Sequence, residues 1–491
     1  MPVDLISDLF VAGEPRRAHS VAFTSVVDPA TEEEIATVVS ADAEDVDAAV
    51  RAAHAVRVAW ASTPVAERCR LVRALAQQIE DRAGALSRTI TRENGTPIAE
   101  ATHAPAAAAA HLRYTADVAP GVLADEVRPN PHGTGDTIVQ RRPRGVAGLI
   151  TPWNYPLSLI VIKLAPALVA GCPVVVKPAA ETPLAARMLM DAVAAAGIPA
   201  GVVNLVTGGA ATGQALVDHP LVAKISFTGS TAVGRRIGET CGRLLRPVVL
   251  ELGGKSPALV LDDAEPDVIA RSILKVSMRN TGQTCKACTR LIVPNTRRRE
   301  IVDLVADVVS SAPLGDPTDP STFFGPLVSA RQRERVLGYL ESGHAEGAKA
   351  VVCGGRPARP VRGFYVEPTV FDDVTPTMRI AREEIFGPVL SVLGYDTLDE
   401  GVALANDTPY GLAGTVFSAD PERAAAVASR IEAGTIGINH YGSSAAAPFA
   451  GHKDSGLGVE LGPEGIEEFL APTSIHRLPP TPPTRQTGEA R

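Results

Sequence analysis

One cysteine of the sequence has the surroundings of a possible nucleophile. Cys285 lies in the stretch from Arg279 to Cys288, where its neighbours are small and polar. A thiol attacks as its thiolate, so a reactive cysteine needs a locally polarised setting. Because this stretch contains no general base, the base and the donor to an oxyanion must come from other parts of the chain.

Glu251 and Asn154 offer these two groups. Glu251 follows five largely apolar residues, and burial would raise the pKa of its carboxyl group toward the range of a base that works near neutral pH. Asn154 carries a neutral amide that could donate to a developing oxyanion. Both residues also have a structural interpretation, since Glu251 could cap the turn at Gly253-Gly254 and Asn154 could belong to a turn before Pro156.

The elements that would position these residues follow an α/β pattern that begins at Arg144. Apolar segments alternate with helical ones, which predicts a parallel, doubly wound sheet. The expected strands are 146–150, 172–176, 202–206, 224–227 and 246–250. Ligands of such sheets bind beyond the carboxyl ends of the strands. In this interpretation a strand end precedes each of four polar residues, Asn154, Lys177, Ser230 and Glu251.

The flanking parts of the chain can be assigned more coarsely. Residues 1–20 are expected to be a loose start, followed by a hairpin over 26–39 and by a helix that Asp42 or Ser40 caps. A second helix over 64–91 ends near Gly95. Further strands are expected at 137–141, 258–260, 350–352, 389–392, 435–439 and 471–477, and disorder in the proline-rich segment 479–485.

Length and composition set limits on the class of protein. A chain of 491 residues is too long for one core, so two or three domains are expected. The formal net charge of −8, without a basic cluster, argues against nucleic acid or an anionic membrane as the main partner. The N-terminal residues lack the features of a secretory signal, and no apolar run is long enough to span a membrane.

The six cysteines are too few for a disulfide framework, which makes a reducing cytoplasm the expected location. Cys285 and Cys288 form a Cys-x-x-Cys pair. A zinc site would need a second pair of ligands at comparable spacing, and the other four cysteines are isolated, so no metal is expected. A reversible disulfide between the two thiols could instead protect a reactive Cys285.

Two segments could hold a phosphorylated ligand. Phe227 to Gly234 contains two glycines five positions apart, and could bind a pyrophosphate at a helix N-terminus with backbone amides and the Ser230 hydroxyl group as donors. A simple turn is the alternative. Lys177 follows a buried strand in a chain that uses 39 Arg and eight Lys. A lysine in a chain that prefers arginine indicates that a compact ammonium group is required there. A solvated charge at the strand end is the alternative.

Four short motifs occur in one order along the chain: Thr151–Asn154, Glu251–Lys255, Gly282–Cys285 and Glu384–Pro388. In this order and spacing they resemble the NAD(P)-dependent aldehyde dehydrogenase superfamily. The resemblance covers about residues 29–470. Each motif alone is modest support, but the ordered set is very specific.

The resemblance implies a doubly wound cofactor domain, a second α/β catalytic domain and a small β arm for oligomerisation. The cofactor would be NAD or NADP, bound by Thr151, Pro152, Trp153, Lys177, Ala180, Glu181, Gly229, Ser230, Val233, Gly234, Leu252, Glu384 and Phe386. Members of the family often carry Glu at the position of Ala180. Because Ala180 supplies no carboxylate that would repel a 2′-phosphate, NADP stays open as the cofactor. NAD is slightly favoured.

The resemblance also implies a mechanism. The Cys285 thiolate attacks the aldehyde carbon, and the Asn154 amide stabilises the alkoxide of the thiohemiacetal. Loss of hydride gives a thioester, which water activated by Glu251 hydrolyses to the carboxylic acid. Transfer of the thioester to coenzyme A is one alternative. A non-catalytic binding protein on the same scaffold is another, although the presence of all three residues argues against it.

The substrate is expected to be a neutral aliphatic or aromatic aldehyde. The segment expected at the substrate entrance, 440–449, is small and uncharged, and Tyr155, Tyr441 and Phe449 are candidate contacts. Arg279 supports an alternative, since succinate-semialdehyde dehydrogenases use a similar Arg to hold the substrate carboxylate. Their second Arg corresponds to Ile162 here, which leaves that clamp incomplete.

The family consists of dimers and tetramers, so a homodimer or homotetramer is expected. The expected division assigns residues 1–120 and 146–251 to the cofactor domain and residues 252–437 to the catalytic domain. Segments 121–145 and 471–491 form the arm and tail, and residues 438–470 return to line the substrate entrance.

Overall fold

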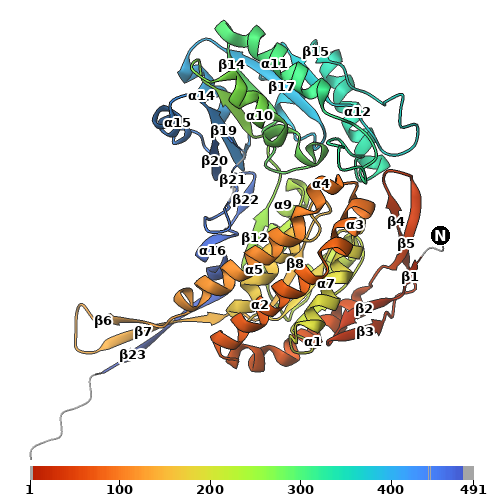
Figure 1. Cartoon of the computed structure of the whole chain (residues 1–491). Helices are drawn as coiled ribbons and strands as arrows, with labels where there is room; N and C mark the ends of the chain where they lie inside the picture. Colours follow the sequence, from red (N-terminus) through yellow and green to blue (C-terminus); the bar gives the residue numbers. More distant parts are fainter. Residues whose placement is uncertain (1–3, 441, 443, 479–491) are drawn as a thin grey trace, which may run out of the picture.

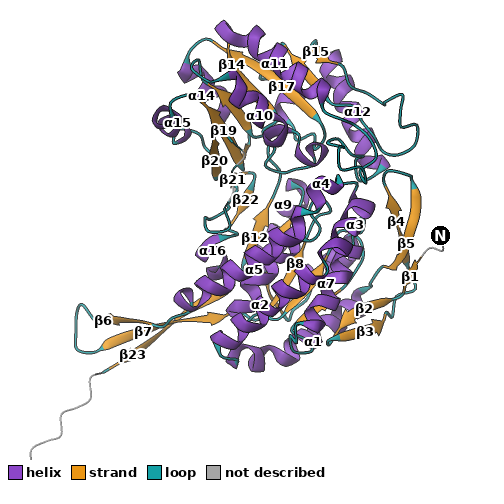
Figure 2. Cartoon of the chain, viewed as in Figure 1, coloured by secondary structure: helices purple, strands orange, loops and turns teal. Residues whose placement is uncertain are grey.

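The computed structural model describes residues 4–440, 442 and 444–478. Two large twisted sheets, each with helices on its faces, form two lobes, and a narrow β arm extends away from them (Figures 1 and 2). The expected α/β fold with two parallel-sheet units and a small arm is therefore confirmed. The exact domain division remains a prediction.

The first sheet has eight strands in the order β22-β12-β11-β8-β9-β10-β2-β3. Its five central strands are parallel, and β22 and β2 flank them in antiparallel pairing. The strands are β2 (Asp8–Val11), β3 (Glu14–Arg17), β8 (Val146–Ile150), β9 (Val174–Lys177), β10 (Val203–Leu205), β11 (Val222–Thr228), β12 (Val248–Glu251) and β22 (Gly456–Leu457).

Helices cover both faces of this sheet because its strands are apolar on both sides. One core packs against α2, α5, α6 and α7, and another against α1, α8 and α9. The helices of this lobe are α1 (Ala43–Ser62), α2 (Val65–Asp81), α3 (Ala83–Asn94), α4 (Ile98–Ala101), α5 (His103–Val122), α6 (Ser158–Ala170), α7 (Leu184–Ala195), α8 (Ala210–Asp218), α9 (Thr231–Arg243) and α16 (Gly462–Glu467).

The second sheet has seven strands in the order β15-β16-β17-β14-β13-β19-β20, and only β15 runs antiparallel to its neighbour. Its strands are β13 (Pro257–Val260), β14 (Arg290–Pro294), β15 (Lys349–Val352), β16 (Thr369–Asp372), β17 (Val389–Tyr395), β19 (Ala413–Phe417) and β20 (Thr435–Ile438). Its helices are α10 (Pro266–Ser277), η1 (Arg279–Gly282), η2 (Asn295–Arg297), α11 (Arg298–Ser311), α12 (Ala330–Ala345), α13 (Arg379–Arg382), α14 (Leu398–Asn406) and α15 (Pro421–Ala428).

A three-stranded sheet in the order β23-β7-β6 forms the arm at the lower left of Figure 1. It consists of β6 (Glu126–Pro129), β7 (Asp136–Pro143) and β23 (Leu470–Arg477). Segments more than 300 positions apart in the sequence pair here along their whole length, Leu470 opposite Pro143 and Arg477 opposite Asp136. Both strands expected in this region are therefore present, whereas the proline-rich segment 479–485 lies outside the described residues.

The N-terminal lobe corrects two sequence-based expectations. Within the expected loose start over 1–20, the described residues from 4 onward are ordered into strands, since β2 joins the main sheet beside β10 and buries Leu9, Phe10 and Val11. The helix expected over 64–91 is two helices, α2 and α3, which meet at Arg82. The expected hairpin is β4 (Phe23–Asp28) with β5 (Glu33–Val39), to which β1 (Asp4–Ile6) adds in parallel.

Local signals that the sequence did show are confirmed. Asp42 caps α1 and forms a capping box with Asp45. Gly95 ends α3 with a φ of 83°, the left-handed conformation that favours glycine. Two remaining short strands, β18 (Tyr410–Gly411) and β21 (His452–Lys453), pair with each other beside the second sheet.

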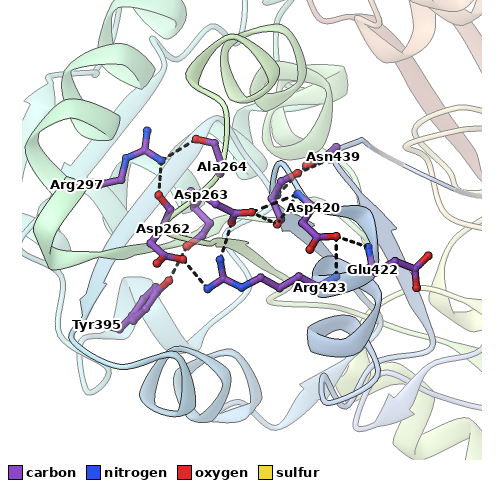
Figure 3. Close-up of polar contacts among 11 residues, drawn as sticks. Asp262, Asp263, Ala264, Arg297, Tyr395, Asp420, Glu422, Arg423 and Asn439 are labelled. Atoms are coloured by element: carbon purple, nitrogen blue, oxygen red, sulfur yellow. Dashed lines mark hydrogen bonds and ion pairs between the residues drawn. The ribbon is translucent and has the colours of Figure 1, made fainter.

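A cluster of charged residues joins the outer elements of the second lobe. Arg423 of α15 lies 2.6 Å from Asp262 and 3.0 Å from Asp263, in the turn after β13 (Figure 3). Asp263 also accepts hydrogen bonds from the Ser418 hydroxyl group at 2.7 Å and from the Asp420 backbone N–H at 3.2 Å. The cluster thus ties α15 to the strand ends β13 and β19.

We expect His111 to make the first lobe sensitive to acid. His111 lies within α5 and its ring is buried. Burial lowers the pKa of the ring from 6.5 to about 4. The folded state therefore favours the neutral ring, and the stabilisation present above pH 6.5 is lost as pH falls toward 4, by about 3 kcal/mol.

In thermal unfolding at pH 7 and pH 4.5, His111→Leu should lose less stability on acidification than the wild type. His132→Leu, which removes an exposed histidine, is the matched control and should behave as the wild type does. Equal acid sensitivity in all three proteins would contradict the role of His111.

Candidate active site

The carboxyl ends of the central strands of the first sheet lie level with one another. Ile150 of β8 pairs with Lys177 of β9 on one side and with Phe227 of β11 on the other. Thr228, the last residue of β11, pairs with Glu251 of β12. Lys177 and Glu251 therefore end their strands rather than follow them, and both lie at the edge where the sequence placed them.

A cleft of about 970 Å³ runs along this edge and reaches the second lobe. Most residues that the sequence singled out line it. These are Thr151, Pro152, Trp153, Asn154, Lys177, Ala180, Glu181, Gly229, Ser230, Val233, Leu252, Cys285, Glu384 and Phe386. The cleft thus joins the segments that precede α6, α7 and α9 to the segment that carries Cys285.

Two of the candidate catalytic and cofactor-binding residues do not line the cleft. Gly234 lies in the first turn of α9 and faces Leu252, where an added Cβ would come within 2.4 Å of the Leu252 side chain. Its role is to let α9 approach the end of β12 closely. Glu251 points into the interior, as described below.

Lys177 is buried at one end of the cleft. Its Nζ donates to the backbone oxygens of Pro178 at 2.6 Å and Gly208 at 2.8 Å. Burial lowers its pKa to about 8, and the carboxylate of Glu181 opposes this shift. An ammonium group carries three hydrogens, so one donor is left for a ligand in the cleft.

The cleft residues that could not be identified from the sequence include four with long polar or charged side chains from α9 and α12. Arg331, Gln332 and Arg335 come from α12 of the second lobe, and Arg236 comes from α9. Arg331 lies 3.2 Å from Glu181 across the cleft. No local pattern marks these residues. The position of the three α12 residues also depends on how the second lobe packs against the first.

Trp153, Phe386 and Glu384 shape the end of the cleft near Cys285. The rings of Trp153 and Phe386 meet edge to face, with centroids 5.2 Å apart, and Phe386 has a φ of 63°. Glu384 accepts a hydrogen bond from the Gly254 backbone N–H at 3.1 Å. Its carboxylate lies so close to Gly253 that a Cβ there would approach Glu384 to 2.6 Å. The motif Glu251–Lys255 thus packs directly on the motif Glu384–Pro388.

Cys285 lies at this end, half-buried. Burial of the thiol, together with the negative charges of Glu384 and Glu251, raises its pKa to about 12. The ammonium group of Lys286 and the Lys286 backbone N–H act in the opposite direction. Without a bound ligand these surroundings favour the protonated thiol. The adjacent Lys286 is the group that favours the thiolate.

Asn154 is tied to the segment that carries Cys285. Its Nδ2 donates to the Gln283 backbone oxygen at 3.0 Å, and its own backbone oxygen accepts from Asn280 Nδ2 at 3.0 Å. Its Oδ1 is buried and has no hydrogen-bond partner among the described residues. One amide hydrogen of Asn154 thus remains for a substrate oxygen near Cys285.

Glu251 is buried, and both carboxylate oxygens lack a hydrogen-bond partner in the described part of the chain. Burial raises its pKa well above 4.5, Glu460 raises it further, and Lys163 lowers it. The expected burial and raised pKa are therefore present. They are the properties of a carboxyl group that can take up a proton near neutral pH.

Lys163, Ser226 and Glu460 form a buried polar group near Glu251. Lys163 forms an ion pair with Glu460, and the Ser226 hydroxyl group lies 3.2 Å from both side chains. Sequence reasoning did not assign these residues. A signal existed for Lys163, the one charged residue in the apolar helix α6, whereas the pairing with Glu460 joins positions 297 apart.

Arg279 and Tyr155 lie on the other side of Asn154 from the cleft, at a cavity of about 70 Å³. Arg279 Nε donates to Glu100 at 2.7 Å, and its guanidinium group lies 5.8 Å from the Tyr155 ring centroid. The Tyr155 hydroxyl group lies 2.7 Å from that of Thr284. Arg279 thus belongs to the segment before Cys285, and Tyr155 contacts that segment through Thr284.

The other candidate substrate residues come from segment 440–449. Phe449 is half-buried, and the Nζ of Lys286 lies 6.0 Å from its ring centroid. Phe449 therefore lies beside the residue that follows Cys285. Tyr441 lies outside the described residues.

Cys288 is buried in the apolar core of the second lobe. Its Sγ lies 3.7 Å from the Thr415 hydroxyl oxygen.

Comparison with known proteins now decides the family. The sequence pattern of the aldehyde dehydrogenase family matches residues 16–475. The chain belongs to the aldehyde dehydrogenase family. It is thereby an NAD(P)-dependent oxidoreductase that acts on aldehydes, as its motifs predicted.

Individual members of the family are similar over nearly the whole chain. Geranial dehydrogenase of Castellaniella defragrans is 46% identical over 96% of this chain and 98% of its own. The crystal structure of a Mycobacterium tuberculosis aldehyde dehydrogenase complexed with NAD+ is 42% identical with a TM-score of 0.94, and covers 98% of this chain and 100% of its own. Aldehyde dehydrogenase C of Pseudomonas syringae, a mutant complexed with NAD+ and octanal, is 41% identical with a TM-score of 0.91 and 96% coverage of both chains.

Among the helices of the described residues, none is both long and apolar enough to cross a membrane.

Proposed function

We propose that this aldehyde dehydrogenase oxidises a neutral aldehyde to its carboxylic acid through a thioester on Cys285. The observation that supports this most is that three groups lie close together: Cys285 and Asn154 line the large cleft, and Glu251 lies near enough for its charge to raise the pKa of Cys285. A thiol, a free amide hydrogen of Asn154 and a buried carboxyl group with a raised pKa come from three separate segments. Together they supply a nucleophile, an oxyanion donor and a base.

In the first stage the Cys285 thiol gives up its proton to solvent and acts as its thiolate. Its sulfur forms a bond to the aldehyde carbon, and the carbonyl π electrons move to the oxygen. The remaining amide hydrogen of Asn154 is placed to stabilise that alkoxide, and the Cys285 backbone N–H is the second donor. The ammonium group of Lys286 favours the thiolate. When the alkoxide collapses, hydride leaves the carbon for the acceptor that a bound nicotinamide cofactor would supply, and a thioester remains.

In the second stage Glu251 acts as a general base. It takes a proton from water, whose oxygen attacks the thioester carbon, and the carbon–sulfur bond breaks to release the acid and restore the thiolate. Its burial without hydrogen-bond partners and the nearby charge of Glu460 keep its pKa high enough to hold that proton. This base also disfavours transfer to coenzyme A, which needs no activated water.

The cleft fits a nicotinamide dinucleotide, which supplies a hydride acceptor when bound. Its volume of about 970 Å³ is sufficient. Gly229 and Ser230 stand at the N-terminus of α9, whose first N–H groups suit a pyrophosphate. Gly229 cannot be larger, since a Cβ would come 2.4 Å from the Phe227 ring. The spare donor of Lys177 suits a ribose hydroxyl group, and Glu384 and Phe386 line the opposite end.

We favour NAD over NADP, with NADP as a second cofactor. Both similar crystal structures described above are complexes with NAD+. Ala180 leaves space beside Lys177 without a carboxylate, and Glu181 pairs with Arg331. A 2′-phosphate would therefore meet two cations and a carboxylate that is already compensated, which permits NADP.

A neutral substrate is favoured because the cation that could hold a carboxylate is already paired. Arg279 forms an ion pair with Glu100 and does not line the cleft. Relatives named for geranial and crystallised with octanal support apolar aldehydes of this kind. A semialdehyde dehydrogenase remains the alternative, because Arg279 lies close to the Cys285 segment.

We further propose that the β arm pairs copies of the chain into a homodimer or homotetramer that works in the cytoplasm. The solvent-exposed side chains of Val127 and Ile475 on this arm would become buried on pairing. We also propose the division into a cofactor domain (1–120 and 146–251), a catalytic domain (252–437), an arm and tail (121–145 and 471–491) and a return segment (438–470).

The first test is formation of reduced nicotinamide by the purified protein with NAD and with NADP. Octanal and succinic semialdehyde should be compared at equal concentrations. We expect kcat/KM at least tenfold higher for octanal, and higher with NAD. Preference for the semialdehyde would reject the neutral pocket. Acyl-CoA as product would reject hydrolysis, and cofactor binding without turnover of any aldehyde would favour a non-catalytic protein.

A further inference from the structure

Three consecutive residues ahead of Cys285 have a left-handed backbone. Asn280, Thr281 and Gly282 have φ values of 50°, 54° and 74°. A β-branched residue such as Thr281 rarely adopts this conformation, so the surrounding structure must hold it in place. Gly282 is packed so closely that an added Cβ would come 2.1 Å from the Gly387 backbone oxygen. The segment that carries the nucleophile is therefore strained and tightly enclosed.

Glu100, in the short helix α4 of the first lobe, contacts the start of this turn. Its Oε2 accepts a hydrogen bond from the Asn280 backbone N–H at 3.1 Å. Its Oε1 accepts from Arg279 Nε at 2.7 Å, and the carboxylate is mostly buried, with 18% of its side chain exposed. One carboxylate thus fixes both the first left-handed residue and the residue before it.

A second connection runs from Glu100 to the residue directly before Cys285. The Tyr155 hydroxyl group lies 3.3 Å from Glu100 Oε1 and 2.7 Å from Thr284 Oγ1. Thr284 is also within 3.1 Å of the Arg279 backbone oxygen. Tyr155 follows the oxyanion residue Asn154. Glu100 is therefore in contact with both stretches whose relative position decides whether thiol and amide can act on one carbonyl group.

We propose that Glu100 is a positioning residue, which holds the Cys285 segment in register with the Asn154 amide through Asn280 and Tyr155. The inference rests on the proposed function of Cys285 and Asn154. It also assigns Arg279 a different role, because an arginine that completes this contact is not available to a substrate carboxylate. A misplacement of about 1 Å between reacting groups can cost about 100-fold in rate.

The test uses Glu100→Ala, Glu100→Gln and matched variants of Asp263 in the full-length protein. Asp263 is a suitable control because it makes the same kinds of contact in the second lobe: one arginine, one backbone N–H and one hydroxyl group (Figure 3). Three quantities are measured: kcat with octanal, the Kd of NAD, and the pH dependence of Cys285 alkylation by iodoacetamide.

We expect Glu100→Ala to lower kcat about 100-fold while the Kd of NAD stays within twofold of the wild type. Glu100→Gln keeps an acceptor for the Asn280 N–H and should recover most of the rate. Release of the segment in Glu100→Ala should also expose the thiol, whose pKa is raised by burial. The midpoint of alkylation should therefore fall by at least about one pH unit. Asp263→Ala and Asp263→Asn should change neither kcat nor the alkylation midpoint.

A Glu100→Ala protein whose kcat falls no further than that of Asp263→Ala would overturn the proposal, as would an equal loss of NAD binding. If Glu100→Ala does not fold, Tyr155→Phe removes the second connection alone and must lower kcat in the same direction. A wild-type protein that turns over no aldehyde would instead reject the proposed function, while the alkylation profiles would still report whether Glu100 positions Cys285.

Discussion

Replacement of Cys285 by alanine should abolish aldehyde oxidation, with a loss of at least about 1000-fold in kcat. The variant has no atom that can form the bond to the aldehyde carbon, and among the described residues no other thiol lines the cleft. Binding of NAD should be unchanged or slightly stronger, because Cys285 occupies only one end of the cleft. Formation of reduced nicotinamide measures the first quantity, and titration calorimetry with NAD measures the second.

Cys288→Ala is the matched control for this prediction. It removes the other thiol of the Cys-x-x-Cys pair, which packs in the apolar core rather than in the cleft. We expect kcat within threefold of the wild type and a small loss of stability, of about 1 kcal/mol. Normal turnover in Cys285→Ala would mean that the nucleophile has been assigned wrongly. Faster irreversible inactivation of Cys288→Ala by dilute peroxide would support protection of Cys285 by a reversible disulfide.

The edge on which the candidate residues Lys177 and Glu251 lie could be predicted because it follows from a simple rule. Strands that alternate with helices become parallel neighbours, so the residues at their carboxyl ends share one edge. Lys177 and Glu251 lie there, as their apolar preceding residues indicated. The sequence pattern did not predict three strands of the second sheet, β14, β16 and β19. These strands have four or five residues and are buried on both faces, so neither length nor alternation distinguishes them from other apolar segments.

The ion pairs around the site could not be predicted, because each pair joins residues that are far apart in the sequence. Lys163 meets Glu460 across 297 positions, and Arg279 meets Glu100 across 179. A sequence can indicate that Lys163 is unusual within an apolar helix, but it cannot identify its partner. For the same reason the sequence indicates Arg279 as a candidate for binding a substrate carboxylate, whereas in the fold Arg279 pairs with the carboxylate of Glu100.

Replacement of Glu251 by glutamine should separate the two halves of the reaction. The amide has nearly the same shape but cannot take a proton from water, so we expect acylation to continue and hydrolysis to slow by about 100- to 10,000-fold. Reduced nicotinamide should then appear as a burst of one equivalent per active site, followed by a very slow steady state. Mass spectrometry of the quenched protein should show an acyl group on Cys285.

The pH dependence gives this prediction a sign. A base must be ionised, and burial with the charge of Glu460 raises the pKa of Glu251, so the steady-state rate of the wild type should rise with pH as Glu251 ionises. That rise should be absent from the slow steady state of Glu251→Gln. Glu460→Gln removes a charge that raises the pKa and should shift the rise to lower pH. Loss of the burst in Glu251→Gln would mean that Glu251 acts earlier, by taking the proton of the Cys285 thiol before the aldehyde is attacked.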